Sequence, residues 1–304
     1  MTGIGPHVPL DDWRARGKRF RYRGHNVFHM DEGGGEALVL IHGFPTASWD
    51  WHRLWPALAA GHRCIAPDML GFGFSAKPRF HDYRIHDQAD LHEALLAELG
   101  VDRYRILAHD YGDSVAQELL ARDIDRRAEG EPGRILGVCL LNGGLFPETH
   151  RARPVQRLLL GPFGWLVSRL ISERAFGHSM RQVFGPETPP SAVEMAAFWQ
   201  LANERGGIRV YHRLIRYIED RRTHRERWVG ALRDAPVPLR LVDGVHDPVS
   251  GGHMAQRYRE LVPDPDVVEL PCGHYPQIEL PAETLAAVEA FLAGSGPVSP
   301  SPGA

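Results

Sequence analysis

The distribution of apolar residues along the chain predicts strands and helices in alternation. Residues 37–41 and 135–141 are nearly uninterrupted apolar runs, which is typical of strands buried on both faces of a parallel sheet. Segments with helical spacing of apolar residues, at about 49–59 and 86–99, separate such runs. This alternation predicts an α/β fold with a mostly parallel, doubly wound sheet. Further elements are expected as strands at 63–66, 105–109, 237–242 and 267–270 and as a last helix at 282–292.

Two regions depart from this alternation. The chain starts with a predicted β-hairpin, in which 19–22 and 27–30 flank a turn. After Pro147 the pattern is helical up to Gly230 and is punctuated by Gly-Pro and Pro-Pro. We therefore expect a core of residues 1–146 and 231–293 with an inserted helical cap at 147–230. A Gly/Ser/Pro-rich flexible tail is expected at 294–304.

Composition narrows the classes of function. The chain has 304 residues, 43% of them hydrophobic, and a formal net charge of −3, so no basic surface suggests a nucleic-acid partner. Cys64, Cys139 and Cys272 lie far apart and match no zinc or redox spacing. The first residues resemble no secretory leader, and no apolar run is long enough to span a bilayer. We expect a cytoplasmic, soluble enzyme that needs no cofactor and no metal.

Asp110 stands at the turn between a predicted strand and a predicted helix. The segment 105–113 is an apolar run that ends in a small-x-Asp-x-Gly turn, and apolar residues then follow at helical spacing. This is the layout of a nucleophile elbow, where small residues flank the nucleophile because the backbone is tight. A carboxylate there can attack an electrophilic carbon and form an ester, which divides one hard displacement into two easier steps.

Three further segments match this nucleophile in order and context. The loop 42–46 follows the strand at 37–41, and in this architecture such a loop donates one backbone N–H to an oxyanion hole. Phe44 and Tyr111 are the expected donors, since the residue after the nucleophile gives the second N–H. Asp247 and His274 each follow a late strand and offer a carboxylate and an imidazole. The order nucleophile, acid, base is the one expected for this fold.

The chain resembles the α/β-hydrolases of the epoxide hydrolase and haloalkane dehalogenase group. The resemblance runs from about residue 20 to 292, and it implies an Asp110 nucleophile, a His274 base and an Asp247 acid partner. The matching stretches are 42–46, 71–75, 109–113, 115–120, 142–144, 146–150, 227–232 and 274–277.

Departures from that group bear on the substrate. Haloalkane dehalogenases hold the halide with donors at the places occupied here by Tyr111 and Phe44, and Phe44 has no side-chain donor. The alternative position of the acid in that group corresponds to Asn142, which leaves Asp247 as the acid. Epoxide hydrolases use cap tyrosines to protonate the epoxide oxygen, and Tyr217 and Tyr211 are the candidates. The tyrosine motif of those enzymes is not reproduced.

Each motif also has a structural interpretation. Ser114 offers a rival elbow, but it lies one turn into the predicted helix. The segment 71–76 mimics a dinucleotide loop but is more typical of a turn. Tyr217 could equally be a packed or buried hydroxyl. His81, Asp82, His86 and Asp87 are expected in a solvated loop and helix start, and 221–227 on a solvated helix face.

These features predict a hydrolase that works through an aspartyl alkyl-enzyme ester, with epoxide hydrolysis to a diol as its expected reaction. Haloalkane dehalogenation by the same chemistry is the enzymatic alternative, and a binding or scaffold protein without turnover is the other. The expected partner is a small apolar electrophile, with no nucleic acid and no membrane span. The protein is expected to be a monomer or a homodimer.

Overall fold

The computed structural model describes residues 7–294 and contains one eight-stranded sheet. The strand order is β1-β2-β4-β3-β5-β6-β7-β8, in which the pairs β1–β2 and β2–β4 are antiparallel and all other neighbouring strands are parallel. The predicted α/β class and its mostly parallel sheet are confirmed. The strands are β1 (Lys18–Tyr22), β2 (His25–Glu32), β3 (Ala37–Ile41), β4 (Arg63–Pro67), β5 (Tyr104–His109), β6 (Ile135–Leu141), β7 (Leu239–Gly244) and β8 (Val267–Leu270).

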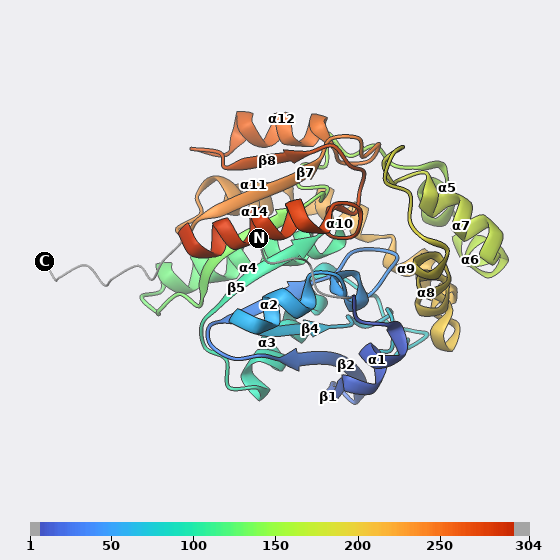
Figure 1. Ribbon diagram of the computed structural model, residues 1–304, viewed down its shortest axis with the longest axis horizontal. Helices are drawn as coiled ribbons and strands as arrows, with labels where there is room; N and C mark the ends of the chain where they lie inside the picture. The colour runs from blue at the N-terminus through green and yellow to red at the C-terminus, as the bar shows by residue number, and fades with distance from the viewer. Residues whose placement is uncertain (1–6, 295–304) are drawn as a thin grey trace, which may run out of the picture.

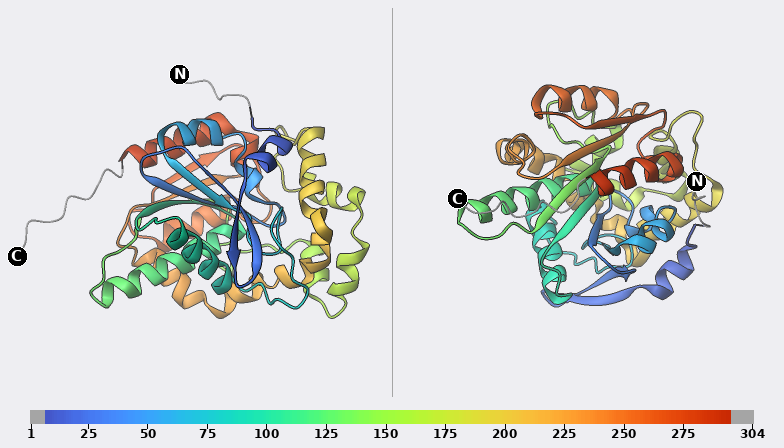
Figure 2. Two further views of the ribbon diagram at one scale, coloured as in Figure 1. Left: turned by 90° about the horizontal axis from the view of Figure 1, so that it is seen from below. Right: turned by 60° about the vertical axis from the view of Figure 1, so that its left-hand side comes forward.

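Helices cover both faces of the sheet. In Figure 2, α2 (Trp55–Gly61) and α14 (Pro281–Gly294) lie on one face, and α3 (Ile85–Glu98), α4 (Tyr111–Ala128) and α11 (Arg225–Arg233) lie on the other. The central strands β3 and β5 are buried along their whole length because both of their faces are covered. The remaining helices of the core are α1 (Leu10–Arg16), η1 (Ser48–Trp51), α12 (Gly252–Leu261) and α13 (Pro276–Glu279).

The segment between β6 and β7 is helical. Helices α5 to α9 lie together beyond one edge of the sheet (Figure 1), while α11 packs against α4 over the sheet itself. The boundaries expected for an inserted cap, 147 and 230, stay a prediction. The helices of this segment are α5 (Pro154–Leu160), α6 (Gly164–Leu170), α7 (Glu173–Arg181), α8 (Ala192–Asn203), η2 (Glu204–Val210), α9 (Tyr211–Leu214), α10 (Tyr217–Thr223) and α11.

Local expectations were met unevenly. The hairpin β1–β2 and the strand bounds 37–41, 135–141 and 267–270 agree with the prediction. The single helix expected at 49–59 is instead a 3-10 turn, η1, followed by α2, which has a proline in its first turn because proline fits there without losing a hydrogen bond. The tail expected at 294–304 lies outside the described residues apart from Gly294.

Candidate active site

Asp110 lies on a strained turn between β5 and α4. Its φ of 49° and ψ of −103° are rare for a residue with a Cβ, as expected at a nucleophile elbow. Gly112 explains how α4 can start so close to β3, because a Cβ added there would lie 2.3 Å from the Ile41 carbonyl oxygen. Gly43 has the same role opposite the elbow, where a Cβ would come 2.7 Å from His109 Nδ1 and 3.1 Å from Asp110 Cβ. The side chain of Asp110 is thereby held at the carboxyl end of the sheet.

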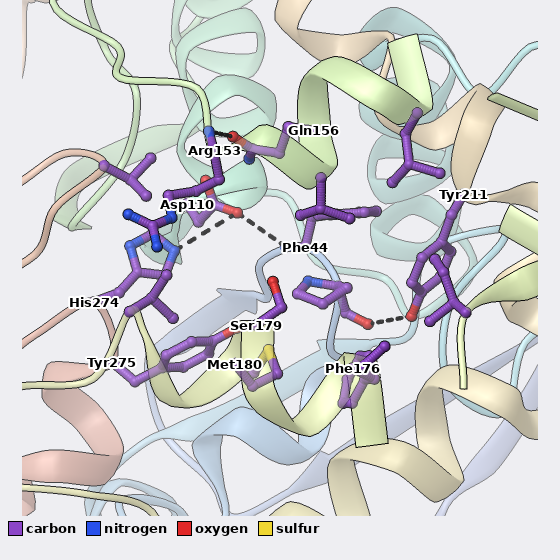
Figure 3. A pocket seen from close by; sticks show the side chains of 17 residues that line it. Phe44, Asp110, Arg153, Gln156, Phe176, Ser179, Met180, Tyr211, His274 and Tyr275 are labelled. Carbon is purple, nitrogen blue, oxygen red and sulfur yellow. Dashed lines mark hydrogen bonds and ion pairs between the residues drawn. The ribbon is translucent and has the colours of Figure 1, made fainter. Parts of the chain in front are cut away.

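The structure brings the three predicted polar residues together. His274 Nδ1 lies 2.8 Å from Asp247 Oδ2. On the other side of the ring, His274 Nε2 lies 3.9 Å from Asp110 Oδ2, and Figure 3 draws this second pair. All three side chains are buried, and each belongs to a loop that follows a strand. The imidazole therefore bridges the two carboxylates, although the Asp110 side is too long for a direct hydrogen bond.

Asp247 is held by a full set of donors. Val249 N donates to Oδ1 at 2.7 Å, and Ser250 donates to Oδ2 through its N–H at 3.1 Å and its hydroxyl at 2.7 Å. Asn142 Nδ2 also lies 3.2 Å from Oδ2, so the amide at the alternative acid position supports Asp247 instead of replacing it. Burial opposes ionisation, but the charge of His274 and these hydrogen bonds keep the pKa of Asp247 below its usual value.

The charges of the site are arranged around Asp110. Burial alone would raise the pKa of the Asp110 carboxyl, but His274 and then Arg221 outweigh it and hold that pKa well below the usual range. Burial would likewise lower the pKa of His274, yet Asp247 and Asp110 together raise it well above 6.5. The two carboxylates and the imidazole thus favour one another's charged forms.

One of the two predicted oxyanion donors contacts the nucleophile. Phe44 N donates to Asp110 Oδ2 at 3.1 Å. Tyr111 is the first residue of α4, so its N–H belongs to the unpaired first turn of the helix. The side chain of Tyr111 points away from the nucleophile into the core, where its hydroxyl donates to the Tyr83 carbonyl at 3.3 Å.

A largely apolar pocket opens above Asp110 and His274 (Figure 3). Its apolar lining comes mostly from α5, α7 and their flanks, with Phe44 and Val249 contributed by the core. Few polar side chains reach it besides Asp110 and His274; they include Arg153, Gln156 and Ser179. The apolar residues that the helical segment contributes to the lining are Val155, Leu159, Ile171, Ala175, Phe176, Met180 and Val183. Such a pocket suits a small apolar molecule that reacts at its inner end.

The two candidate tyrosines lie in different surroundings. Tyr211 lines the pocket, and its hydroxyl donates to the Pro45 carbonyl at 2.8 Å. Tyr217 is buried but does not line the pocket; its ring packs against Tyr111 and lies 4.5 Å below the Arg221 guanidinium. Only Tyr211 of the pair is therefore placed to meet a bound molecule.

Arg221 is a residue that the sequence pattern did not reveal. The expectation of a solvated helix face at 221–227 is wrong at this position, because the Arg221 side chain is only 2% exposed. Its Nη2 donates to the Asp110 carbonyl at 2.8 Å and lies 3.5 Å from Asp110 Oδ1. Its Nε donates to the Ser114 hydroxyl at 2.6 Å, so the rival nucleophile is buried and already bonded. These partners lie more than a hundred residues away, so no local signal predicts them.

The remaining motifs form structure. In the glycine-rich turn at 71–76, Phe74 N donates to Asp68 Oδ2 at 2.6 Å, so this backbone N–H is bonded to a carboxylate of the chain itself. His81 Nε2 lies 2.5 Å from Asp87 Oδ2. Between residues 7 and 294 no group of three or more His, Cys, Asp or Glu side chains is arranged to hold a metal ion.

The sheet, the elbow and the helical segment over the pocket define the class of protein. The α/β hydrolase fold family matches residues 36–183, and the chain belongs to this family, as its motifs predict. Along nearly its whole length the chain is similar to the mesoderm-specific transcript homolog protein of Homo sapiens, with 42% identity over 307 residues that cover 94% of this chain and 90% of that protein.

Two other similarities fall within the expected group. Haloalkane dehalogenase 2 of Mycobacterium tuberculosis is 28% identical over 268 residues, which cover 86% of this chain and 90% of that protein. The solved structure of the epoxide hydrolase CorEH aligns with a TM-score of 0.75 and 21% identity, covering 91% of this chain and 98% of that chain. The latter likeness concerns the fold.

Proposed function

We propose that this hydrolase acts through an ester formed on Asp110. The observation that carries the proposal is the position of a buried carboxylate at the elbow, 3.9 Å from His274 and at the inner end of an apolar pocket. Asp110 would attack an electrophilic carbon of the substrate, and the bond from that carbon to its leaving atom would break. The substrate class is a small apolar electrophile, and no cofactor or metal enters the scheme.

The second half-reaction would depend on a change of charge. When Asp110 becomes an ester it loses the negative charge that helps to keep His274 protonated. The imidazole can then release its proton more readily and accept one from water, with Asp247 stabilising the imidazolium that forms. That water would attack the ester carbonyl carbon, and the N–H groups of Phe44 and Tyr111 would stabilise the oxyanion. The tetrahedral intermediate then collapses with cleavage of the carbon–oxygen bond to the substrate, and the departing product oxygen takes a proton from the His274 imidazolium. Asp110 is regenerated as a carboxylate that carries one oxygen of the water, and its carboxyl proton passes to solvent.

An epoxide is the electrophile that the pocket supports best. Ring opening leaves an alkoxide, which needs a proton, and burial raises the pKa of the Tyr211 hydroxyl so that it stays protonated at neutral pH. We propose that Tyr211 donates this proton after exchanging Pro45 O for the epoxide oxygen, and that it regains a proton from solvent before the next turnover. Tyr217, the first candidate by sequence, lies behind Phe44 and Arg221 instead of along the pocket.

Dehalogenation remains the alternative, and the similarity to haloalkane dehalogenase 2 supports it. Two placements argue against it. Phe44 offers only its backbone N–H, and the Tyr111 hydroxyl is directed at Tyr83 in the core, so neither position presents a side-chain donor to a halide in the pocket.

A substrate panel tests the proposal. The purified protein is incubated with terminal and aryl epoxides and with bromoalkanes of matching size, and diol formation and halide release are measured in parallel. Diol formation that is lost in Asp110→Ala is expected. Halide release without any diol would favour dehalogenation. No turnover in either series, with tight retention of the same compounds, would favour a binding or scaffold protein.

A further inference from the structure

The short helix α6 exposes the residues that a soluble helix would bury. Its inner side is made by Gly164 and Ser168, which are buried. Its outer side carries Trp165, Leu166 and Leu170, with exposed fractions of 46%, 41% and 72%. Phe163, just before the helix, is 67% exposed. Because folding alone gains nothing from this inversion, the outer side of α6 has the character of a contact surface.

A basic groove lies directly beside this helix. It runs between the loop at 77–80, α6, η2 and α9, and Trp165 and Phe80 contribute its aromatic side chains. Phe80 is the most exposed large apolar side chain described, at 84%. No Asp or Glu lines the groove. Its cationic side chains are Lys77, Arg79, Arg169, Arg205, Arg209 and Arg213.

Several of these charges have no internal counter-charge. Arg205 and Arg213 reach Glu204 and Asp82 only at 3.6 and 3.8 Å. Arg79, Arg169 and Arg209 form no ion pair with any carboxylate of residues 7–294. Arg79 and Arg169 instead lie over the rings of Phe80 and Trp165, at 5.4 and 5.1 Å from the ring centroids. Aromatic side chains next to unpaired guanidinium groups are typical of proteins that bind at a membrane interface.

We propose that α6 and the basic groove dock this protein reversibly on the surface of an anionic lipid bilayer. The groove would hold lipid phosphate groups, while Phe163, Trp165, Leu166 and Leu170 enter the interfacial layer. A small anion alone would leave the apolar side of α6 unexplained. A second copy of the chain on a two-fold axis would bring two such groups of cations together, which opposes association.

The docking surface continues toward the active site. Ile171, the residue after α6, lines the apolar pocket, as does Leu159 at the end of α5. Figure 1 shows α6 at the outer edge of the helical segment, on the side away from the sheet. If the proposed function holds, an apolar substrate dissolved in the bilayer could pass from lipid to the pocket along α5 and α6. The docking itself does not depend on that function.

Vesicle flotation tests the docking. The full-length protein is mixed with vesicles of phosphatidylcholine alone or of phosphatidylcholine with phosphatidylglycerol, at low and at high salt. Co-flotation is expected with the anionic vesicles at low salt, with release as salt screens the surface charge. Brominated lipid should quench part of the tryptophan fluorescence of the wild type, and Trp165→Phe should remove that quenching while flotation persists.

Two pairs of variants locate the surface. Arg169→Glu with Arg209→Glu should weaken vesicle binding by roughly thirtyfold or more, since each basic residue near an anionic surface contributes about fivefold. Arg103→Glu with Arg259→Glu makes the same change in net charge on exposed residues that do not line the groove, before β5 and in α12, and should retain most of the binding. Leu166→Ser with Leu170→Ser should abolish co-flotation, whereas Val193→Ser, another exposed apolar residue, should not.

Three results would overturn the proposal. The first is no binding to anionic vesicles at low salt, and the second is equal weakening by the groove pair and by its charge-matched control. The third is self-association of the wild type in light scattering that Leu166→Ser with Leu170→Ser removes, without vesicle binding, which would make α6 a contact between two copies. Thermal melting of each variant checks that the fold is retained. Neither melting nor flotation depends on an enzymatic readout.

Discussion

At the scale of single residues, the site depends on one imidazole between two carboxylates. Asp247 contacts His274 at 2.8 Å and stays charged throughout the proposed cycle, while Asp110 loses its charge when the ester forms. The base needed for ester hydrolysis is the neutral imidazole, whose pKa both carboxylates raise. The rate of the second half-reaction should therefore be controlled by the charge on Asp247.

A pH profile tests this dependence. A protonated imidazole cannot act as the base, so ester hydrolysis should be slow at low pH and should rise as His274 loses its proton. Asp247 raises the midpoint of this rise, which should still lie below the pKa of His274 in the free enzyme, where Asp110 is also charged. Asp247→Asn should move that midpoint toward acid and slow hydrolysis by roughly 10⁴-fold, by analogy with the serine-protease triad. Ser250→Ala keeps the charge and should leave the midpoint near that of the wild type. An unchanged midpoint in Asp247→Asn would show that Asp247 does not raise the pKa of His274.

The two tyrosines give a second prediction. Tyr211→Phe should lower epoxide turnover about a hundredfold or more, because one donor to the developing alkoxide is lost. Tyr217→Phe should change kcat by much less, since its ring contacts with Tyr111 and Arg221 remain. Initial rates of diol formation at saturating epoxide distinguish the pair. The reverse order of effects would return the role of the acid to Tyr217.

Arg221 gives a third prediction. Its guanidinium is buried against the Asp110 carbonyl and the Ser114 hydroxyl, so Arg221→Gln should lower the free energy of unfolding by about 3 kcal/mol. It should also raise the pKa of Asp110, because one of the charges that lower it is gone. Arg221→Lys keeps the positive charge but loses the planar guanidinium with its several N–H donors. Its Asp110 pKa should therefore be closer to that of the wild type than its free energy of unfolding is. Chemical denaturation and the acid limb of single-turnover alkylation measure the two effects.

At the scale of elements, the turn from β5 into α4 fixes where the nucleophile lies. Gly112→Ala would place a Cβ 2.3 Å from the Ile41 carbonyl oxygen, so α4 must move away from β3. We expect a loss of about 1–3 kcal/mol in stability, with a larger loss of activity as Asp110 shifts. Gly61→Ala has open space at its Cβ and serves as the matched control. Equal melting temperatures for the two variants would show that the elbow is not tightly packed.

Elements were predictable from sequence where their burial is uniform. The strands at 37–41 and 267–270 have the expected bounds, because one apolar run and its turn signals determine each of them. Helix α12 was not predicted; its buried apolar side consists only of Met254, Ala255 and Tyr258, among polar residues. The 3-10 turn η1 before α2 likewise has no periodicity to reveal it.

At the scale of the whole molecule, sequence order located most of the site because parallel strands end at one edge of the sheet. Asp110, Asp247 and His274 each follow a strand, and the topology of β5, β7 and β8 brings them together. No comparable rule relates the sequence of the helical segment over the pocket to the positions of its side chains. Whether Tyr211 or Tyr217 faces the pocket, and whether Arg221 is buried, depends on how α9 and α10 pack on the core. No helix described between residues 7 and 294 is long and apolar enough to cross a membrane.

The central claim is the ester on Asp110, and trapping it is the most direct test. His274→Gln keeps the nucleophile and removes the base, so alkylation should proceed and hydrolysis should stop. Intact-mass spectrometry after incubation with an epoxide that the wild type hydrolyses should show one added substrate per chain, and peptide mapping should place it on Asp110. No adduct with any such substrate, or an adduct on Ser114 instead, would contradict the account.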